Sequence, residues 1–232
     1  MPLSLNKRAA IDSHALSAIQ YPSMKNTQPI PAPVVGRLSL YLRQVEQLAR
    51  QGRTKVSSRE LAESLQITDA KVRKDLAWFG NFGSPGVGYR IEPLIEALRH
   101  VMGTDRTWDV VVVGVGDLGR ALLRYRGFRR KGFRVLGAFD VAPTKVGKKI
   151  GEVPVWHFDQ LPEIIRQHKV KLAVVAVPAE AAQGVVDKLC RCGIKGILNF
   201  AATSLQTSAG VAVSQVDLAA SLEQLSFQMV RK

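Results

Sequence analysis

The sequence predicts an α/β protein with two domains, a small N-terminal domain made mainly of helices and a larger C-terminal domain built on a parallel sheet. Residues 37–79 carry apolar side chains at helical spacing, and a glycine-rich stretch follows them. From Trp108 onward, continuous β-branched runs alternate with helical segments, as in proteins whose parallel strands are joined by helices. With 232 residues, 46% of them hydrophobic, the chain is long enough to bury one large core or two smaller ones.

We expect residues 1–35 to form a basic, flexible tail. Apolar residues follow no regular period in this stretch, and prolines interrupt it at positions 22, 29, 31 and 33. The sequence has no apolar run long enough to cross a membrane, and no apolar segment follows the basic pair near the N-terminus as in a secretion signal. The expected location is therefore the cytoplasm, without a membrane partner.

Residues 36–92 are predicted to form a winged helix-turn-helix domain. The first helix places its apolar residues on one face, at positions 38, 41, 42, 45, 48 and 49. Ser57 and Glu60 have the spacing of a capping box at the start of a second helix, and Thr68 can cap a third. Glycines at positions 80, 83, 86 and 88 then favour a tight β-ribbon, which is the wing. Residues 93–107 are expected to form a linker helix.

The third helix of such a domain lies in the DNA major groove. Lys71, Arg73 and Lys74 cluster near its start. The forked guanidinium of Arg73 fits guanine O6 and N7, whereas Lys74 suits a phosphate. A net charge of +14 and a pI near 10.2 favour a polyanionic partner over the alternative, a solvated helix face. The further residues assigned to this surface are Ser57, Ser58, Thr68, Gly86 and Tyr89.

Residues 108–213 are predicted to form a Rossmann-like domain that binds a dinucleotide. Its expected strands lie at 109–114, 133–140, 170–177 and 195–200, and its helices at 117–126, 159–168 and 179–191. The first strand runs into Gly-x-Gly-x-x-Gly, in which the glycines allow a tight turn, a close approach to a pyrophosphate and close helix packing. The assigned cofactor residues are Gly114, Val115, Gly116, Asp117, Leu118, Gly119, Asp140, Lys145, Pro178 and Asn199.

Asp140 ends the second strand and stands 21 residues after Gly119, where a carboxylate accepts a hydrogen bond from a ribose 2′-hydroxyl. Such a carboxylate repels a 2′-phosphate, so NAD(H) is favoured over NADP(H), although Lys145, Lys148 and Lys149 weaken that preference. Two alternatives stay open. The glycines could serve packing alone, or the domain could bind coenzyme A or S-adenosylmethionine.

No residue pattern points to catalysis or to a metal. His14 lies in the expected tail and His100 in the expected linker, and His157 and His168 have no carboxylate placed in sequence to orient them. Tyr125 lacks the lysine four residues on that short-chain dehydrogenases use. Cys190 and Cys192 lack the further ligands of a zinc site. We therefore expect no enzyme and no metal, with a dehydrogenase as the rival interpretation.

The chain resembles one family from about Arg37 to Met229, the Rex redox-sensing transcriptional repressors of bacteria. The resemblance rests on strings such as VRKDLAWFGNFGSPGVGYRI, VVVGVGDLGRALLRY and VDLAASLEQLSFQM. The wing departs from the family, because Ser84-Pro85 stands where a basic residue is usual.

This resemblance implies a homodimer that binds a palindromic operator and leaves it when NADH binds. It also implies that a C-terminal helix, residues 214–232, is exchanged between subunits as a domain-swapped helix. Asp217 on that helix resembles an acid that alternates between two partners, and Arg43 and Tyr125 stand at the positions of those partners.

Overall fold

The computed structural model describes residues 32–79, 82–84 and 87–230. The chain divides into two compact units, with the division between Asp105 and Arg106.

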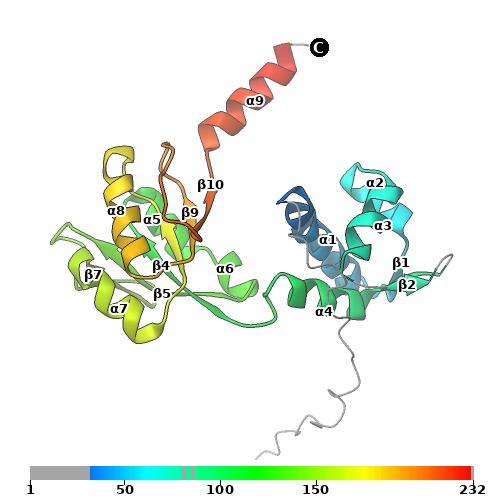
Figure 1. Ribbon diagram of the computed structural model, residues 1–232, viewed down its shortest axis with the longest axis horizontal. Helices are drawn as coiled ribbons and strands as arrows, with labels where there is room; N and C mark the ends of the chain where they lie inside the picture. The colour runs from blue at the N-terminus through cyan, green and yellow to red at the C-terminus, as the bar shows by residue number, and fades with distance from the viewer. Residues whose placement is uncertain (1–31, 80–81, 85–86, 231–232) are drawn as a thin grey trace, which may run out of the picture. The chain divides into compact units, whose positions relative to one another are not determined.

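The N-terminal unit combines helices with a small antiparallel sheet, as predicted for a winged helix-turn-helix (Figure 1). The sheet has the order β1-β3-β2, and β3 pairs with both of its neighbours. The elements are α1 (Ala32–Arg50), β1 (Lys55–Val56), α2 (Ser58–Leu65), α3 (Asp69–Ala77), β2 (Gly83–Ser84), β3 (Gly88–Arg90) and α4 (Ile91–Val101).

The helix α1 begins at Ala32, six residues before the first residue of the predicted apolar pattern. Pro33 was expected to interrupt the chain here. It instead lies in the first helical turn, where the backbone N–H that proline lacks has no partner within the helix. Val34 is buried in the same turn. The last residues of the expected tail therefore belong to a helix.

The helix starts within this unit follow the predicted caps. Ser57 and Glu60 form both hydrogen bonds of a capping box before α2, and the Thr68 hydroxyl accepts from the N–H of Lys71 at the start of α3. Residues 93–107 were expected to link the domains, but α4 packs into the N-terminal core through Ile91, Leu94, Ile95 and Leu98. Its apolar spacing signals this burial as strongly as that of α1.

The C-terminal unit is a doubly wound α/β domain. Its sheet has the order β10-β9-β8-β4-β5-β7-β6, which from β7 to β10 is the 3-2-1-4-5-6 order of the Rossmann fold, and its strands pair in parallel except β6 with β7. The strands are β4 (Trp108–Val113), β5 (Phe133–Asp140), β6 (Lys149–Ile150), β7 (Val153–His157), β8 (Leu172–Val175), β9 (Gly196–Asn199) and β10 (Ala212–Gln215). The helices are α5 (Asp117–Arg124), α6 (Gly127–Arg130), α7 (Leu161–His168), α8 (Ala179–Arg191) and α9 (Leu218–Val230).

The central strands are buried on both faces, as their continuous β-branched runs predicted. Val111 and Val113 face one core together with α7 and α8, whereas Val110 and Val112 face the opposite core. Leu122 and Leu123 of α5 pack against this second core. The domain therefore has helices on both sides of a parallel sheet.

The end of the chain differs from the single helix expected over residues 214–232. Residues 212–215 form β10, which extends the sheet beside β9, and α9 starts only at Leu218. None of the described α9 residues is buried, although the helix is predominantly apolar.

Candidate nucleotide site and DNA-binding surface

The turn from Gly114 to Gly119 lies where the winding of the sheet reverses. β4 and β8 are adjacent and parallel, but α5 follows β4 on one face of the sheet and α8 follows β8 on the other. In open α/β sheets, a crevice forms at this position beyond the carboxyl ends of the strands, and ligands bind there. The structure thus places the predicted glycine turn at the expected binding position.

The three glycines meet different surroundings. A Cβ atom on Gly114, whose φ is +97°, would lie 2.3 Å from the Ala176 carbonyl oxygen, and one on Gly119 would lie 2.0 Å from the Gly114 carbonyl oxygen. At Gly116, among the described residues, nothing lies within 4 Å of the same position. Gly114 and Gly119 are therefore required by packing, whereas the space beside Gly116 is open for a ligand.

The Asp140 carboxylate is hydrogen-bonded directly to this turn. One carboxylate oxygen accepts from the Val115 N–H (2.8 Å) and from the Lys145 ammonium (3.0 Å), and the other accepts from the Ala142 N–H (2.9 Å). Burial raises the pKa of Asp140, but these donors outweigh it and hold the pKa below its usual value. A carboxylate has about four acceptor positions, so one stays available for a hydroxyl donor such as a ribose.

The remaining residues assigned to the cofactor lie at or just after the carboxyl ends of β4, β8 and β9. Val115 is buried, the Asp117 carboxylate is exposed and pairs with Arg120, and the Leu118 side chain is 38% exposed at the start of α5. Pro178 precedes α8 at the carboxyl end of β8 and is exposed.

Asn199 is fully buried at the end of β9, and its amide is occupied within the protein. The amide nitrogen donates to the Ala201 and Thr203 carbonyls and to Gln215 Oε1, and the amide oxygen accepts from the Ala201 N–H. The bond to Gln215 joins β9 to β10, and the others hold the segment that follows β9. They give Asn199 a structural role that its position in an apolar strand did not indicate.

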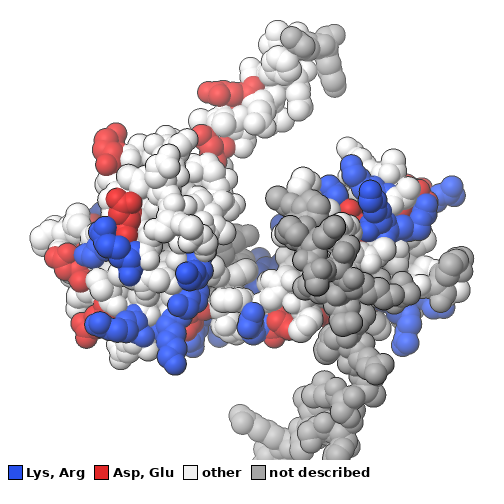
Figure 2. Space-filling model, in the orientation of Figure 1, with Lys and Arg blue, Asp and Glu red and all other residues white. Residues whose placement is uncertain are grey.

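In the N-terminal unit, α3 presents one apolar face and one basic face. Val72, Asp75 and Leu76 are buried, whereas Lys71, Arg73 and Lys74 are exposed. Figure 2 shows blue basic side chains gathered over α2 and α3, with acidic side chains among them. An exposed, basic third helix is what major-groove recognition needs.

The other residues assigned to DNA contact lie at the edges of this face. Ser57, Ser58 and Thr68 lie at the starts of α2 and α3, and Tyr89 on β3 is half-buried, with its pKa raised by burial. Gly86 lies outside the described residues. Of the helix-start residues, Ser58 contacts the basic face directly, because its hydroxyl accepts from Arg73 at 3.3 Å.

Sequence reasoning did not identify Asp75, a charged residue with 3% exposure on the buried face of α3. Its carboxylate accepts from Arg37 Nε (2.5 Å) and Nη2 (2.9 Å) and from the Tyr41 hydroxyl (2.7 Å). Burial raises the pKa of Asp75, but the bonds from Arg37 and Tyr41 lower it overall. An acid directly before Leu76, on the apolar side of the helix, was the available signal.

The three residues assigned to switching lie on different elements. Arg43 is exposed on α1, and Tyr125 is 57% exposed after α5, with its ring edge-on to Phe128 at 5.2 Å. Asp217 caps α9, because its carboxylate accepts from the Ala220 N–H (2.9 Å).

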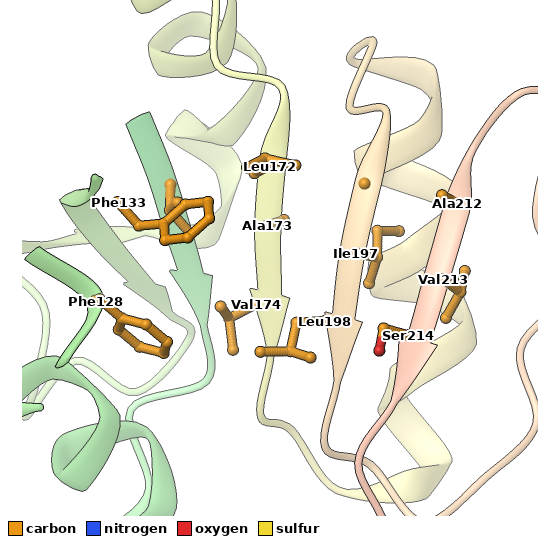
Figure 3. Close-up of a pocket in the computed structure, with 12 residues that line it drawn as sticks. Phe128, Phe133, Leu172, Ala173, Val174, Ile197, Leu198, Ala212, Val213 and Ser214 are labelled. Atoms are coloured by element: carbon orange, nitrogen blue, oxygen red, sulfur yellow. The ribbon is translucent and has the colours of Figure 1, made fainter. Parts of the chain in front are cut away.

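One face of the larger sheet has an apolar groove of about 360 Å³, lined by the strands and, at one edge, by Phe128 of α6. The labelled side chains follow the strands β8, β9 and β10, and the rings of Phe128 and Phe133 lie at one edge (Figure 3).

Within the described ranges, no three His, Cys, Asp or Glu side chains gather as metal ligands. Among the same described residues, no helix is both long enough and apolar enough to cross a membrane.

Family comparisons agree with this division of the chain. Residues 29–77 match a family model described as the N-terminus of a putative DNA-binding protein, and residues 105–203 match one described as a CoA binding domain.

Fold and site together define a transcription regulator, in which a winged-helix DNA-binding domain is joined to a Rossmann-like nucleotide domain. The chain is 48% identical over 202 residues to the redox-sensing transcriptional repressor Rex of Carboxydothermus hydrogenoformans, covering 87% of this chain and 97% of that one. The chain therefore belongs to the Rex family of redox-sensing transcriptional repressors. Since these relatives are named as repressors, the expectation that the chain is a regulator rather than an enzyme is confirmed.

Solved structures of RSP, a Rex-family repressor, have the same fold. RSP in complex with β-NAD+ and operator DNA matches with a TM-score of 0.83 and 34% identity, covering 87% of this chain and 93% of RSP. RSP in complex with β-NADH matches with a TM-score of 0.80 and 33% identity, covering 87% and 95%.

Proposed function

We propose that this protein represses transcription by binding a palindromic operator through its winged helix and that it leaves the operator when NADH binds at the Gly114–Gly119 turn. The observation that carries the proposal is the open space beside Gly116, next to Asp140, in a chain whose α3 exposes a basic face. The RSP complexes with NAD+ and operator DNA and with NADH support both ligands. Both ligands occur in the cytoplasm, where we propose that the protein acts.

The proposed mechanism is allosteric. NADH and DNA favour different arrangements of the same protein, so each ligand lowers the affinity for the other. A sensor must also distinguish NADH from NAD+, because a ligand that binds both arrangements equally shifts nothing. The uncharged nicotinamide ring of NADH suits an apolar surrounding better than the cationic ring of NAD+.

A titration of NADH into a complex with labelled operator DNA tests this function. We expect release of the DNA at an NADH concentration that rises when NAD+ is added as a competitor. If DNA binding persists at saturating NADH, with NADH binding verified by calorimetry, the sensor function is wrong.

We also propose that the protein is a homodimer and that α9 is the exchanged helix. Two exposed apolar surfaces support this proposal. Leu218, Leu222 and Leu225 on α9 are each more than half exposed, and the sheet has an open apolar groove. Contiguous exposed apolar surface of this kind marks interfaces between proteins. In such a dimer, Asp217 would alternate between Arg43 and Tyr125 as the ligands change.

Light scattering coupled to gel filtration tests the dimer. The double variant Leu222→Glu with Leu225→Glu places two charges in the proposed interface, so we expect a monomer. Gln224→Glu on the opposite side of the same helix is the matched control, and it should stay a dimer. A wild-type monomer at micromolar concentration, or a dimer that resists the double substitution, would contradict the assignment.

A second candidate, binding of coenzyme A, is favoured by the family model matched at residues 105–203. Thermal shifts with NADH, NAD+ and coenzyme A distinguish the two functions, because a ligand stabilises the state that binds it. We expect NADH to raise the melting temperature most. The largest shift with coenzyme A would favour the second candidate.

A further inference from the structure

The Arg73 side chain has specific partners on the basic face of α3. Its Nη1 group forms an ion pair with Asp69, one turn earlier in α3, and donates to the Ser58 hydroxyl of α2 at 3.3 Å. The bond from Arg73 lowers the pKa of Asp69, so the carboxylate is charged at neutral pH. All three side chains lie at the start of a helix or one turn into it.

These contacts leave the arginine fork open on its other edge. A guanidinium can donate two parallel hydrogen bonds from Nε and Nη2, as Arg37 does to Asp75 in this domain. Arg73 uses only Nη1 in the contacts described above. Guanine O6 and N7 accept from such a pair of donors, so the geometry that holds Nη1 preserves the base-reading edge.

The position of Asp69 also carries an electrostatic cost on DNA. A carboxylate in the first turn of the helix favours folding through the helix dipole. It also lies on the helix that is expected to enter the groove, where negative charge opposes binding to phosphates. The residue therefore weakens non-specific affinity while it holds the arginine that reads a base.

We propose that Asp69, together with Ser58, is a positioning pair that fixes Arg73 for bidentate contact with one guanine and thereby determines specificity at that base pair. The inference rests on the proposed function, because it requires recognition of DNA by α3. A flexible arginine loses rotamer freedom when it binds, whereas one already held loses less. Asp69 thus exchanges total affinity for discrimination.

The test begins with selection of preferred duplexes from a random double-stranded DNA library by the wild-type full-length protein. Affinities are then measured for the preferred duplex and for each single base-pair substitution. Arg73→Ala identifies the base pair that Arg73 reads. Asp69→Asn should then lower discrimination at that pair by about three- to tenfold and leave other positions unchanged. Affinity for unrelated DNA should rise by up to about threefold.

Two controls separate positioning from other effects. In the Arg73→Ala background, Asp69→Asn should change nothing at that base pair, because the residue acts through the arginine. Glu63→Gln removes the same charge from α2, where the described residues show no ion pair to Glu63, so it should leave discrimination at every position intact.

The outcomes are distinct. If the wild type selects no sequence, the proposed function fails. If it selects one but Asp69→Asn keeps full discrimination at the Arg73 position, the inference is wrong. Equal losses at every position together with a lower melting temperature would also overturn it, since they indicate a role in helix stability only.

Discussion

Gly116 and Gly119 lie three residues apart in one turn, yet a methyl group would meet very different surroundings at the two positions. At Gly119 it would overlap the Gly114 carbonyl oxygen at 2.0 Å, whereas at Gly116 the space among the described residues is empty to 4 Å. Gly116 also has φ −76° and ψ −165°, angles that alanine adopts without strain. Packing within the protein therefore explains the glycine at position 119. At position 116 packing requires no glycine, and we expect the reason to be a bound ligand.

We expect Gly119→Ala to lower the free energy of unfolding by about 1–3 kcal/mol, because the backbone of the turn must move. Gly116→Ala should fold normally and gain up to about 1 kcal/mol through the unfolded chain, while NADH affinity falls at least about tenfold because the methyl group occupies the place of the pyrophosphate. Calorimetric melting and NADH titration of both variants check this. Normal NADH affinity in Gly116→Ala would contradict the assignment of the open space.

Asp140 makes the site sensitive to acid. Its pKa in the folded protein lies below the unfolded value of about 3.9, so its contribution to stability is present above that value and is lost as the pH falls through the folded pKa. We expect Asp140→Asn to lower the free energy of unfolding by about 1–3 kcal/mol at pH 7, with the difference from wild type shrinking below about pH 4. Scanning calorimetry between pH 3 and 7 measures the gap. A gap independent of pH would show that the charge contributes nothing.

Motifs made of residue types at fixed spacing could be predicted from the sequence. The hydrogen-bond partners of buried polar side chains could not. The glycine turn, Asp140 and the helix caps at Ser57 and Thr68 each follow from a local pattern that the structure reproduces. The buried amide of Asn199 and the buried carboxylate of Asp75 find partners that the linear sequence does not identify. For Asp75 these partners lie 34 and 38 residues away. Non-local pairing of polar groups needs the fold itself.

Helices and strands, like single residues, could be predicted where the signal is local and were missed where the structure depends on non-local pairing. Helices α2 and α3 start at their predicted caps, and α8 spans its predicted range, because caps and apolar spacing are local. β10 was missed, since its four residues are all exposed and its strand conformation comes from pairing with β9. The start of α1 was missed because a proline signals either an interruption or a first helical turn.

The placement of α3 against α1 depends on the buried carboxylate of Asp75. We expect Asp75→Asn to destabilise the protein by about 2–4 kcal/mol, because the Arg37 guanidinium is left without a charged partner. Tyr41→Phe removes only one hydrogen bond and should cost about 1–2 kcal/mol. Urea denaturation followed through the helical signal measures both. A loss below about 0.5 kcal/mol for Asp75→Asn would mean that apolar packing alone holds α3.

At the scale of the whole molecule, two domains with separate cores carry the two binding functions on one chain. The apolar groove and the exposed α9 are surfaces that a single chain leaves open. Local sequence patterns predicted each domain, because each is specified by its own periodicity and turn. Coupling between the two binding sites is a difference in free energy between states of the whole protein. No periodic pattern in the sequence encodes such a difference.

That coupling has a quantitative consequence. If NADH lowers operator affinity by some factor, operator DNA must lower NADH affinity by the same factor, typically about 5- to 150-fold for a regulator. The measurement is NADH binding by calorimetry with and without saturating operator, compared with operator affinity with and without NADH. A non-operator duplex of equal length is the control and should change NADH affinity much less, because it does not select the operator-bound arrangement. A factor near one in either titration would contradict the coupling. Unequal factors would mean that the two titrations contain different protein species, such as a dissociated dimer in one of them, because reciprocity holds for any single equilibrium cycle.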